Sequence, residues 1–163
     1  MISKKIQSAL NDQLNAEFYA AYLYLGMSAC FHATGLNGFS DWMRVHAQEE
    51  MMHGMKIYEF LNSRDGKVEL KQIDAPPGKW SSTLAAFENA LKHEKEVTAQ
   101  INNLVDLAVG ERDHATNVFL QWFVTEQVEE EATIGKIVAQ LKLIGTDGNG
   151  LFLLDRDMGS RAD

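Results

Sequence analysis

The sequence predicts an all-α protein, a four-helix bundle with a long crossover between its second and third helices and a short fifth helix at the C-terminus. Apolar residues recur at alternating steps of three and four through four segments of roughly thirty residues each, without the alternation of a strand. Turn-forming residues gather between these segments, at residues 34–38, 66–80, 110–113 and 145–150. With 163 residues and 45% hydrophobic composition, we expect one domain over residues 1–163, with the bundle at about 5–144 and the short helix at about 148–158.

Each predicted helix has one apolar stripe and recognisable ends. The four stripes, in chain order, are Leu10, Leu14, Ala21 and Leu25; Met43, Ile57 and Phe60; Leu84, Phe87, Leu91, Ile101 and Val105; and Phe119, Phe123, Ile134, Ile137 and Leu141. Ser81 and Asp113 are predicted N-caps of the third and fourth helices. Glycines stand where helices should stop, at Gly35, Gly66, Gly110 and Gly145.

The segment after Gly150 is too short to join the bundle but carries the apolar run from Leu151 to Leu154. It is therefore predicted to form a short helix that docks on its own bundle or on a neighbouring chain.

Charge and cysteine content exclude several classes of protein. The net charge is -8, and no cluster of Lys or Arg is present, so we expect no nucleic-acid partner. Cys30 is the only cysteine, which excludes an intrachain disulfide and fits a reducing compartment. No apolar run approaches the length of a membrane span. The expectation is a soluble, cytoplasmic protein that does not contact a membrane.

Every apolar stripe is interrupted by polar residues near its middle. The interrupting residues, in chain order, are Glu17; Glu50 and His53; Glu94 and Thr98; and Gln127 and Glu130. Glu17 and Glu50 are 33 residues apart with their midpoint at the start of the turn at 34–38, and Glu94 and Gln127 are also 33 apart, with their midpoint between Gly110 and Glu111. In antiparallel hairpins such pairs lie at one height, so the interruptions are predicted to meet in one polar layer with pseudo-twofold symmetry.

A buried layer of carboxylates needs a compensating cation. Glu17, Glu50, Glu94 and Glu130 lie in the stripes without Lys or Arg at their level, and burying an unpaired carboxylate costs several kcal/mol. Two divalent ions would neutralise the layer, and carboxylates with one imidazole favour iron or manganese. Glu111 and His114 repeat the Glu-x-x-His spacing of Glu50 and His53, but in a turn where solvated charge is ordinary.

At this point the chain resembles the bacterial non-haem ferritins over its whole length. The resemblance is carried by Glu17, by HAQEEMMH at 46–53, by Glu94 and by FLQWFVTEQVEEE at 119–131. It implies a ferritin-like diiron domain with two iron ions per chain. One iron would be held by Glu17, Glu50 and His53, and the other by Glu50, Glu94 and Glu130, with Gln127 beside the pair. A third iron position would use Glu49, Glu126, Glu129 and Glu130.

The resemblance also implies an activity and an assembly. Ferrous iron would be oxidised by dioxygen or peroxide, and the ferric product would be stored as a mineral in a hollow shell of twenty-four identical chains. Tyr24 would lie beside the diiron pair, whereas the pattern alone favours a core tyrosine with a satisfied hydroxyl.

For the remaining residues, the pattern favours structural or solvated roles over metal binding. Of the three acids from Glu129 to Glu131, only Glu130 falls in the inward stripe, so Glu129 as a ligand depends on the resemblance. His46, His93 and His114 are predicted to be structural or solvated. Cys30 is predicted to be a small core residue, and Trp122 a packing or interface aromatic.

The sequence bears on three alternatives to a non-haem ferritin. A haem-carrying bacterioferritin is expected to have His where this chain has Glu130, so no haem is expected. Met51 does not decide between the haem-carrying and haem-free branches, because methionine at that position also occurs in the haem-free branch. A rubrerythrin-like peroxidase would need a four-cysteine iron module, which one cysteine excludes. A metal-free helical interaction protein would leave the polar layer unexplained.

Overall fold

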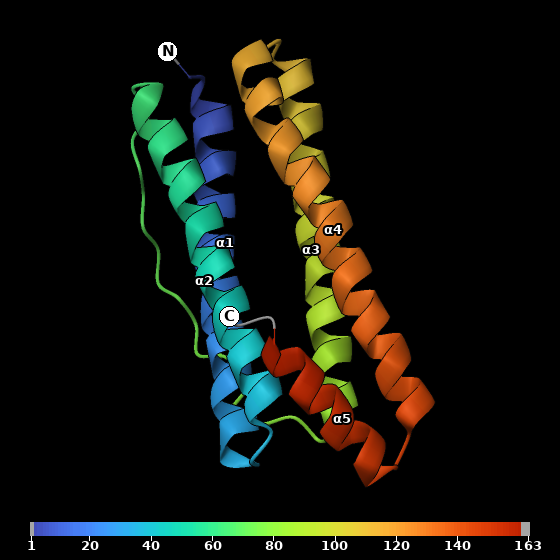
Figure 1. Cartoon of the computed structure of the whole chain (residues 1–163). Helices are drawn as coiled ribbons and strands as arrows, with labels where there is room; N and C mark the ends of the chain where they lie inside the picture. Colours follow the sequence, from blue (N-terminus) through green and yellow to red (C-terminus); the bar gives the residue numbers. More distant parts are fainter. Residues whose placement is uncertain (1, 161–163) are drawn as a thin grey trace.

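The computed structural model describes residues 2–160, and their secondary structure consists of helices without strands. The helices are α1 (Lys4–Ala33), α2 (Asn37–Ser63), α3 (Thr83–Gly110), α4 (His114–Ile144) and α5 (Gly148–Gly159). The helices α1 and α2 form one antiparallel hairpin, and α3 and α4 form the other (Figure 1). The predicted fold class, including the long crossover and the short fifth helix, is confirmed.

Side-chain caps fix the starts of α1, α3, α4 and α5. Ser3 accepts a hydrogen bond from the backbone N–H of Ile6, and Asp113 accepts one from that of Thr116, as predicted for Asp113. The cap of α3 is Ser82 rather than the predicted Ser81, because Ser82 has the extended backbone and accepts from the N–H of Ala85. Adjacent serines offer the same signal, and only the backbone decides between them.

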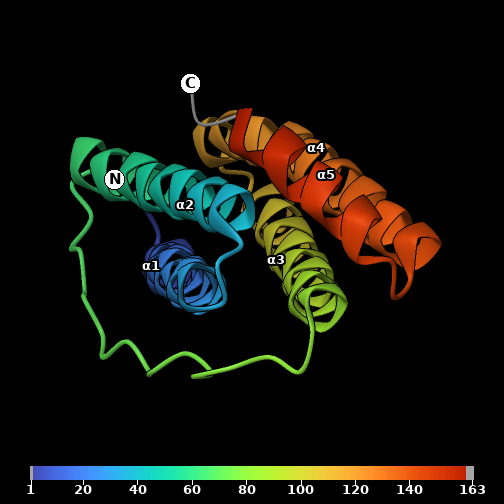
Figure 2. The same cartoon turned by 60° about the horizontal axis from the view of Figure 1, so that its bottom comes forward.

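The crossover between α2 and α3 is held to α1 by a ladder of amide side chains. Asn11 donates to the carbonyl of Lys67 and accepts from the N–H of Glu69, at 2.9 and 2.7 Å. One turn later, Asn15 donates to the carbonyl of Glu69 and accepts from the N–H of Lys71, at 2.8 and 2.7 Å. The extended segment thus gains partners for its backbone while it runs outside the bundle (Figure 2).

The core consists of two hydrophobic clusters. One contains Leu23, Met27, Phe31, Phe39 and Ile134 among others, towards the end where α5 lies. The other is built from further residues of the same four long helices, which include Ile6, Leu10, Leu61, Ile101 and Leu120. The polar side chains of the predicted layer lie in the sequence between the members of these two clusters on every helix. The bundle therefore has a dry core on each side of its polar middle.

The helix α5 docks on its own bundle, against α2. The backbone of the two helices touches at Gly38, where an added Cβ would lie 1.6 Å from the carbonyl oxygen of Asp155. The side chain of Asp155 also accepts a hydrogen bond from the N–H of Phe39, at 2.9 Å, in the first turn of α2. This answers the open question of where the short helix packs in the single chain.

Two expectations about buried residues are wrong. Leu25 is 49% exposed, because it lies on the flank of α1 beside Tyr22, which is itself 46% exposed. Cys30 is only partly buried and lines a small pocket with Thr34 and Trp80 at the end of the bundle.

Between residues 2 and 160, no helix combines the length and the apolar character needed to cross a membrane.

Candidate metal centre

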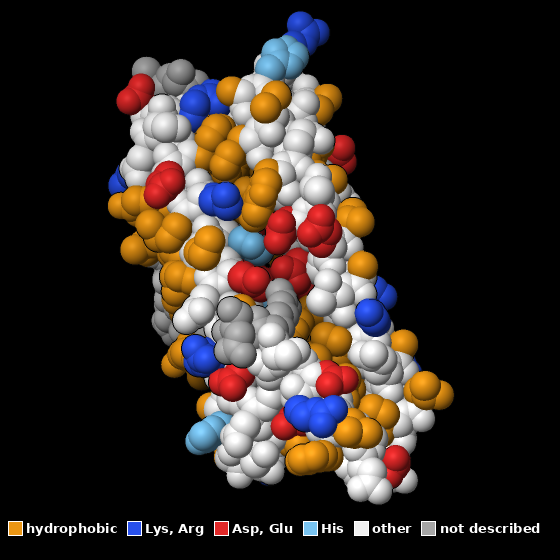
Figure 3. Space-filling model, in the orientation of Figure 1, with side chains coloured by type: hydrophobic (Ala, Val, Ile, Leu, Met, Phe, Trp, Pro, Cys, Tyr) orange, Lys and Arg blue, Asp and Glu red, His pale blue; other side chains and the backbone are white. Residues whose placement is uncertain are grey.

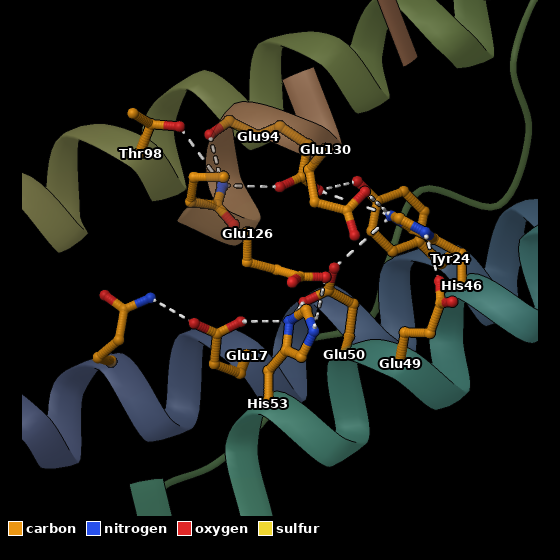
Figure 4. A network of polar contacts seen from close by, with 12 residues as sticks. Glu17, Tyr24, His46, Glu49, Glu50, His53, Glu94, Thr98, Glu126 and Glu130 are labelled. Atoms are coloured by element: carbon orange, nitrogen blue, oxygen red, sulfur yellow. Dashed lines mark hydrogen bonds and ion pairs between the residues drawn. The ribbon is translucent and has the colours of Figure 1, made fainter. Parts of the chain in front are cut away.

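The residues that interrupt the apolar stripes meet in the middle of the bundle (Figure 4). Each of the four long helices supplies at least one of them, and the buried ones, in chain order, are Glu17, Glu50, His53, Glu94, Gln127 and Glu130. Apart from Thr98, which is only partly buried, the predicted polar layer is therefore present as a cluster of residues with exposed fractions of 6% or less.

Two groups of side chains share Glu50. In the first, oxygen and nitrogen atoms of Glu17, Glu50 and His53 lie within 4.8 Å of one another. His53 Nδ1 lies 3.3 Å from Glu50 Oε2 and 4.0 Å from Glu17 Oε2. In the second group, atoms of His46, Glu50 and Glu130 meet the same limit. One carboxylate between two groups is the arrangement that a pair of bridged metal ions requires.

Hydrogen bonds hold the two outer carboxylates of the cluster. Gln13 lies one turn before Glu17 on α1 and donates to its Oε1 at 2.7 Å. On the opposite side, the hydroxyl of Tyr24 donates to Glu94 Oε1, and the amide of Gln127 donates to Glu94 Oε2 at 3.0 Å. Tyr24 is thus a buried tyrosine with a satisfied hydroxyl and also a neighbour of the carboxylate cluster.

Burial and mutual repulsion make several of these carboxyls unusually weak acids. Burial and the charge of Glu94 raise the pKa of Glu50 from 4.5 to about 8. Burial also raises the pKa of Glu130 to about 7, with contributions from Glu94 and Glu49. The pKa of Glu17 is raised by burial and by Glu50.

Two members of the cluster are shifted toward their charged forms. Burial alone would raise the pKa of Glu94, but its contacts with His46, Tyr24 and Gln127 lower that pKa. Burial opposes the charged form of His46 as well, yet Glu49, Glu94, Glu130 and Glu50 together raise its pKa from 6.5 to about 10.

The chemistry of the cluster fits divalent cations. The ion pairs of Glu17, Glu50, Glu94 and Glu130 within residues 2–160 are with the imidazoles of His46 and His53. Glu17 Oε2 and His46 Nε2 are buried and lack a hydrogen-bond partner among the described residues. Since orphaned buried polar atoms are rare in folded proteins, Glu17 Oε2 marks where a cation would bind. The imidazole of His46 keeps its proton, because its pKa is raised to about 10.

The residues expected for a third iron lie at the edge of the cluster, to different extents. Glu49 Oε2 is 3.2 Å from His46 Nδ1, and its side chain is 36% exposed. Glu126 Oε1 is 3.8 Å from His53 Nε2, and Glu126 forms a third group with His53 and Glu130. Glu129 is exposed and belongs to none of the three groups. Figure 3 shows acidic side chains around a histidine at mid-height on the face where α2 and α4 lie in front.

The second Glu-x-x-His pair lies far from this chemistry. Glu111 and His114 are exposed near the turn between α3 and α4, and Glu111 pairs with Lys5 at 3.6 Å.

Trp122 packs its ring against His53 with centroids 5.2 Å apart and is 38% exposed.

His46 is the residue of the cluster that the sequence analysis set aside. It is fully buried, and its Nε2 lies 3.4 Å from Glu130, 3.6 Å from Glu50 and 3.9 Å from Glu94. The signal for it was available, because residues 46, 50 and 53 are spaced by four and three and so share one helix face.

Comparison with known proteins agrees with this arrangement. The family model for ferritin, described as a ferritin-like domain, matches residues 7–144. The bacterial non-heme ferritin of Bacteroides fragilis is 42% identical over 161 residues, which cover 99% of this chain and 100% of that protein. The bacterial non-heme ferritin of Campylobacter jejuni is 43% identical over 156 residues, covering 96% of this chain and 93% of that protein.

A solved structure shows the same likeness in three dimensions. The open pore ferritin of the archaeon Archaeoglobus fulgidus superposes with a TM-score of 0.96 at 52% identity, covering 98% of each chain. With a family match over most of its length and relatives above 40% identity, the chain belongs to the ferritin family.

Proposed function

We propose that this protein stores iron and oxidises ferrous ions with dioxygen inside its helical bundle. Glu17, Glu50 and His53 would bind one ferrous ion, and Glu50, Glu94 and Glu130 the other, so that Glu50 bridges them. Gln127 would lie beside the pair and orient Glu94, to which its amide donates. Tyr24 would hold the other oxygen of Glu94.

The observation that carries this proposal is the set of four buried glutamates from four helices, whose only ion pairs within residues 2–160 are with imidazoles. A helical protein that merely packs against a partner gains nothing from such a layer, because buried carboxylates without a cation are destabilising. Two divalent ions supply four positive charges in the same space. The layer is therefore best explained by ions that bind there as substrate.

The reaction follows from holding two ferrous ions together. Each ion gives up one electron, and one dioxygen takes up both electrons and two protons to leave as hydrogen peroxide. The carboxylates stabilise the ferric products, because hard oxygen donors favour the higher charge. Ferric ions that leave the pair hydrolyse and can be stored as mineral. Peroxide can replace dioxygen as the electron acceptor.

A third iron position would lie at the exposed edge of the pair. Glu49, Glu126, Glu129 and Glu130 are its proposed ligands, and the nearness of Glu49 and Glu126 to the two imidazoles supports the first two. Glu129 would have to turn toward this edge on binding iron, since its side chain is exposed.

The protein would act as a homo-oligomeric shell of twenty-four chains in the cytoplasm, without haem. An exposed apolar surface supports self-association: Phe18, Tyr22, Leu25, Met51 and Ile73 line a groove of about 690 Å³ on the flank of α1 and α2. Apolar patches of this kind commonly mark interfaces between chains.

An aerobic ferrous titration of the purified protein, followed by size-exclusion chromatography, tests the function. We expect absorbance of ferric species to grow at two ferrous ions per chain, and iron to co-elute with a large particle at higher loading. A Soret band would indicate a haem protein instead. If ferrous addition produced no iron absorbance above the buffer rate, the storage function would be refuted and an interaction protein would be favoured.

A further inference from the structure

His46 is held rigidly at the border between the diiron pair and the exposed edge of the site. Its ring stacks on Trp42, with centroids 4.9 Å apart and planes inclined by 15°. The Tyr24 ring packs against it edge-on, at a centroid distance of 4.4 Å. With no exposed surface and an aromatic ring on each of two sides, the imidazole is closely confined.

The two ring nitrogens of His46 face different parts of the centre (Figure 4). Nε2 points into the cluster of Glu50, Glu94 and Glu130, while Nδ1 lies 3.2 Å from Glu49 Oε2. An ionised carboxylate has only acceptors, so the Nδ1–H group donates to Glu49. The imidazole therefore connects the buried pair with the one proposed third-site ligand that α2 supplies.

Glu49 itself is a side chain that needs orienting. It is 36% exposed at the edge of the cluster, and a glutamate in such a place can populate several rotamers. The contact with a fixed ring selects the rotamer that keeps the carboxylate beside the site.

We propose that His46 is a positioning residue for the third iron, which it serves by holding Glu49 at the edge of the diiron pair. This inference depends on the proposed function and adds to it a residue that acts through another side chain. Outer partners of metal ligands typically change metal affinity by about 10- to 100-fold when they are removed. We expect a loss in this range for the third ion and little change for the first two.

Two amide substitutions test the roles of the two ring nitrogens of His46 one at a time. His46→Asn retains a donor close to the place of Nδ1 and removes the group at Nε2, whereas His46→Gln retains an amide close to Nε2 and removes the donor at Nδ1. Binding of cobalt(II), which air does not oxidise here, is measured per chain by calorimetry, and oxygen uptake is measured at two and three ferrous ions per chain. The exposed His114→Gln serves as the control.

The expected result is a split between the two amides. His46→Gln should weaken binding of the third ion by about tenfold or more, as Glu49→Ala should. The two substitutions together should cause no further loss, because they break the same contact. His46→Asn should keep third-ion affinity within about threefold of the parent protein, since the donor to Glu49 remains.

Several results would overturn the proposal. Unchanged third-ion affinity in His46→Gln would do so, as would a parent protein that binds only two cobalt ions per chain. Loss of the first two ions in both amide variants would make His46 a ligand of the pair instead. If His46→Gln does not fold, a loss larger than about threefold in His46→Asn still contradicts it. Failure of ferrous oxidation in the parent protein refutes the proposed function separately, because cobalt binding is read without oxidation.

Discussion

Glu50 is the residue that joins the two halves of the centre, because its carboxylate belongs to two of the three groups of candidate metal ligands. Its position follows from the sequence, since the spacing from Glu17 and His53 requires it to face the bundle axis. Its raised pKa of about 8 does not follow from the sequence, because that value depends on burial and on the distance to Glu94. The inward position of the proposed ligands of the pair was thus readable from the pattern, whereas their electrostatics required the packed structure.

His46 shows where the residue pattern was insufficient. Taken alone, each histidine on an apolar face is expected to be structural, which gave no reason to single out His46. Its place among three carboxylates depends on how closely α2 approaches α3 and α4 at that level. Gln13 was missed for a similar reason, because its hydrogen bond to Glu17 lies within one helix but matters only once Glu17 is buried.

Removing single acids from α4 should distinguish the ligands of the diiron pair from those of the third iron. Glu130→Ala removes a proposed ligand of the pair, and the first fast oxidation at two ferrous ions per chain should slow by at least about tenfold. Glu129→Ala removes an exposed acid and should leave that phase nearly intact while changing the oxygen consumed at three ions per chain. Stopped-flow absorbance with oxygen uptake measures both. Equal loss of the fast phase in the two variants would contradict the division into a pair and a third position.

The raised pKa values predict how the stability of the metal-free protein depends on pH. Between pH 4.5 and about 8, folded Glu50 keeps a proton that the unfolded chain has lost, and Glu130 behaves likewise up to about 7. His46 holds its proton from 6.5 up to about 10 when folded. Because the folded state binds more protons in these ranges, its free energy of unfolding should fall as pH rises from 6 to 9.

A divalent ion should reverse this trend, because it replaces the protons. Adding Zn²⁺ should raise the thermal unfolding midpoint more at pH 8 than at pH 6. Thermal scans with and without the ion measure this, with Glu50→Gln as a variant in which both the pH slope and the zinc effect shrink. A metal-free midpoint that rises steadily between pH 6 and pH 9 would contradict the account of the buried carboxyls.

At the scale of elements, the number, order and approximate bounds of the helices could be predicted because the apolar period of 3.6 is sustained through each segment. The places where the prediction differed are local: a cap one residue later, at Ser82, and an exposed Leu25. The amide ladder of Asn11 and Asn15 could not be predicted, because both residues meet a crossover more than fifty positions away. The site depends on this ladder only through the placement of α1.

The contact between α2 and α5 predicts a sharp response to one methyl group. Gly38→Ala would place a Cβ 1.6 Å from the backbone of Asp155, so α5 must shift and the protein should lose about 1–3 kcal/mol of stability. Gly135→Ala in α4 is the matched control, because its Cβ meets nothing within 4 Å and should stabilise the helix by about 0.5–1 kcal/mol. Chemical denaturation measures both. A Gly38→Ala variant as stable as the parent would mean that α5 is not docked there.

At the scale of the whole molecule, the proposed shell predicts a particle of about 440 kDa, which is twenty-four times the chain mass of 18.3 kDa. Size-exclusion chromatography with light scattering measures this mass directly. A stable monomer or dimer that still mineralises iron fully would contradict the shell, although the site within each chain could remain intact. The apolar groove on α1 and α2 gives a reason to expect association, but the sequence pattern does not fix the number of chains.

The rate of ferrous oxidation in two variants with the same local motif tests the central claim most directly. Glu50→Ala removes the carboxylate shared by the two groups, and Glu111→Ala removes the corresponding acid of the exposed Glu-x-x-His pair. Stopped-flow absorbance after two ferrous ions per chain should show the fast phase abolished in Glu50→Ala and nearly unchanged in Glu111→Ala. Equal rates in the two variants, whether both fast or both slow, would contradict a reaction centred on the buried layer.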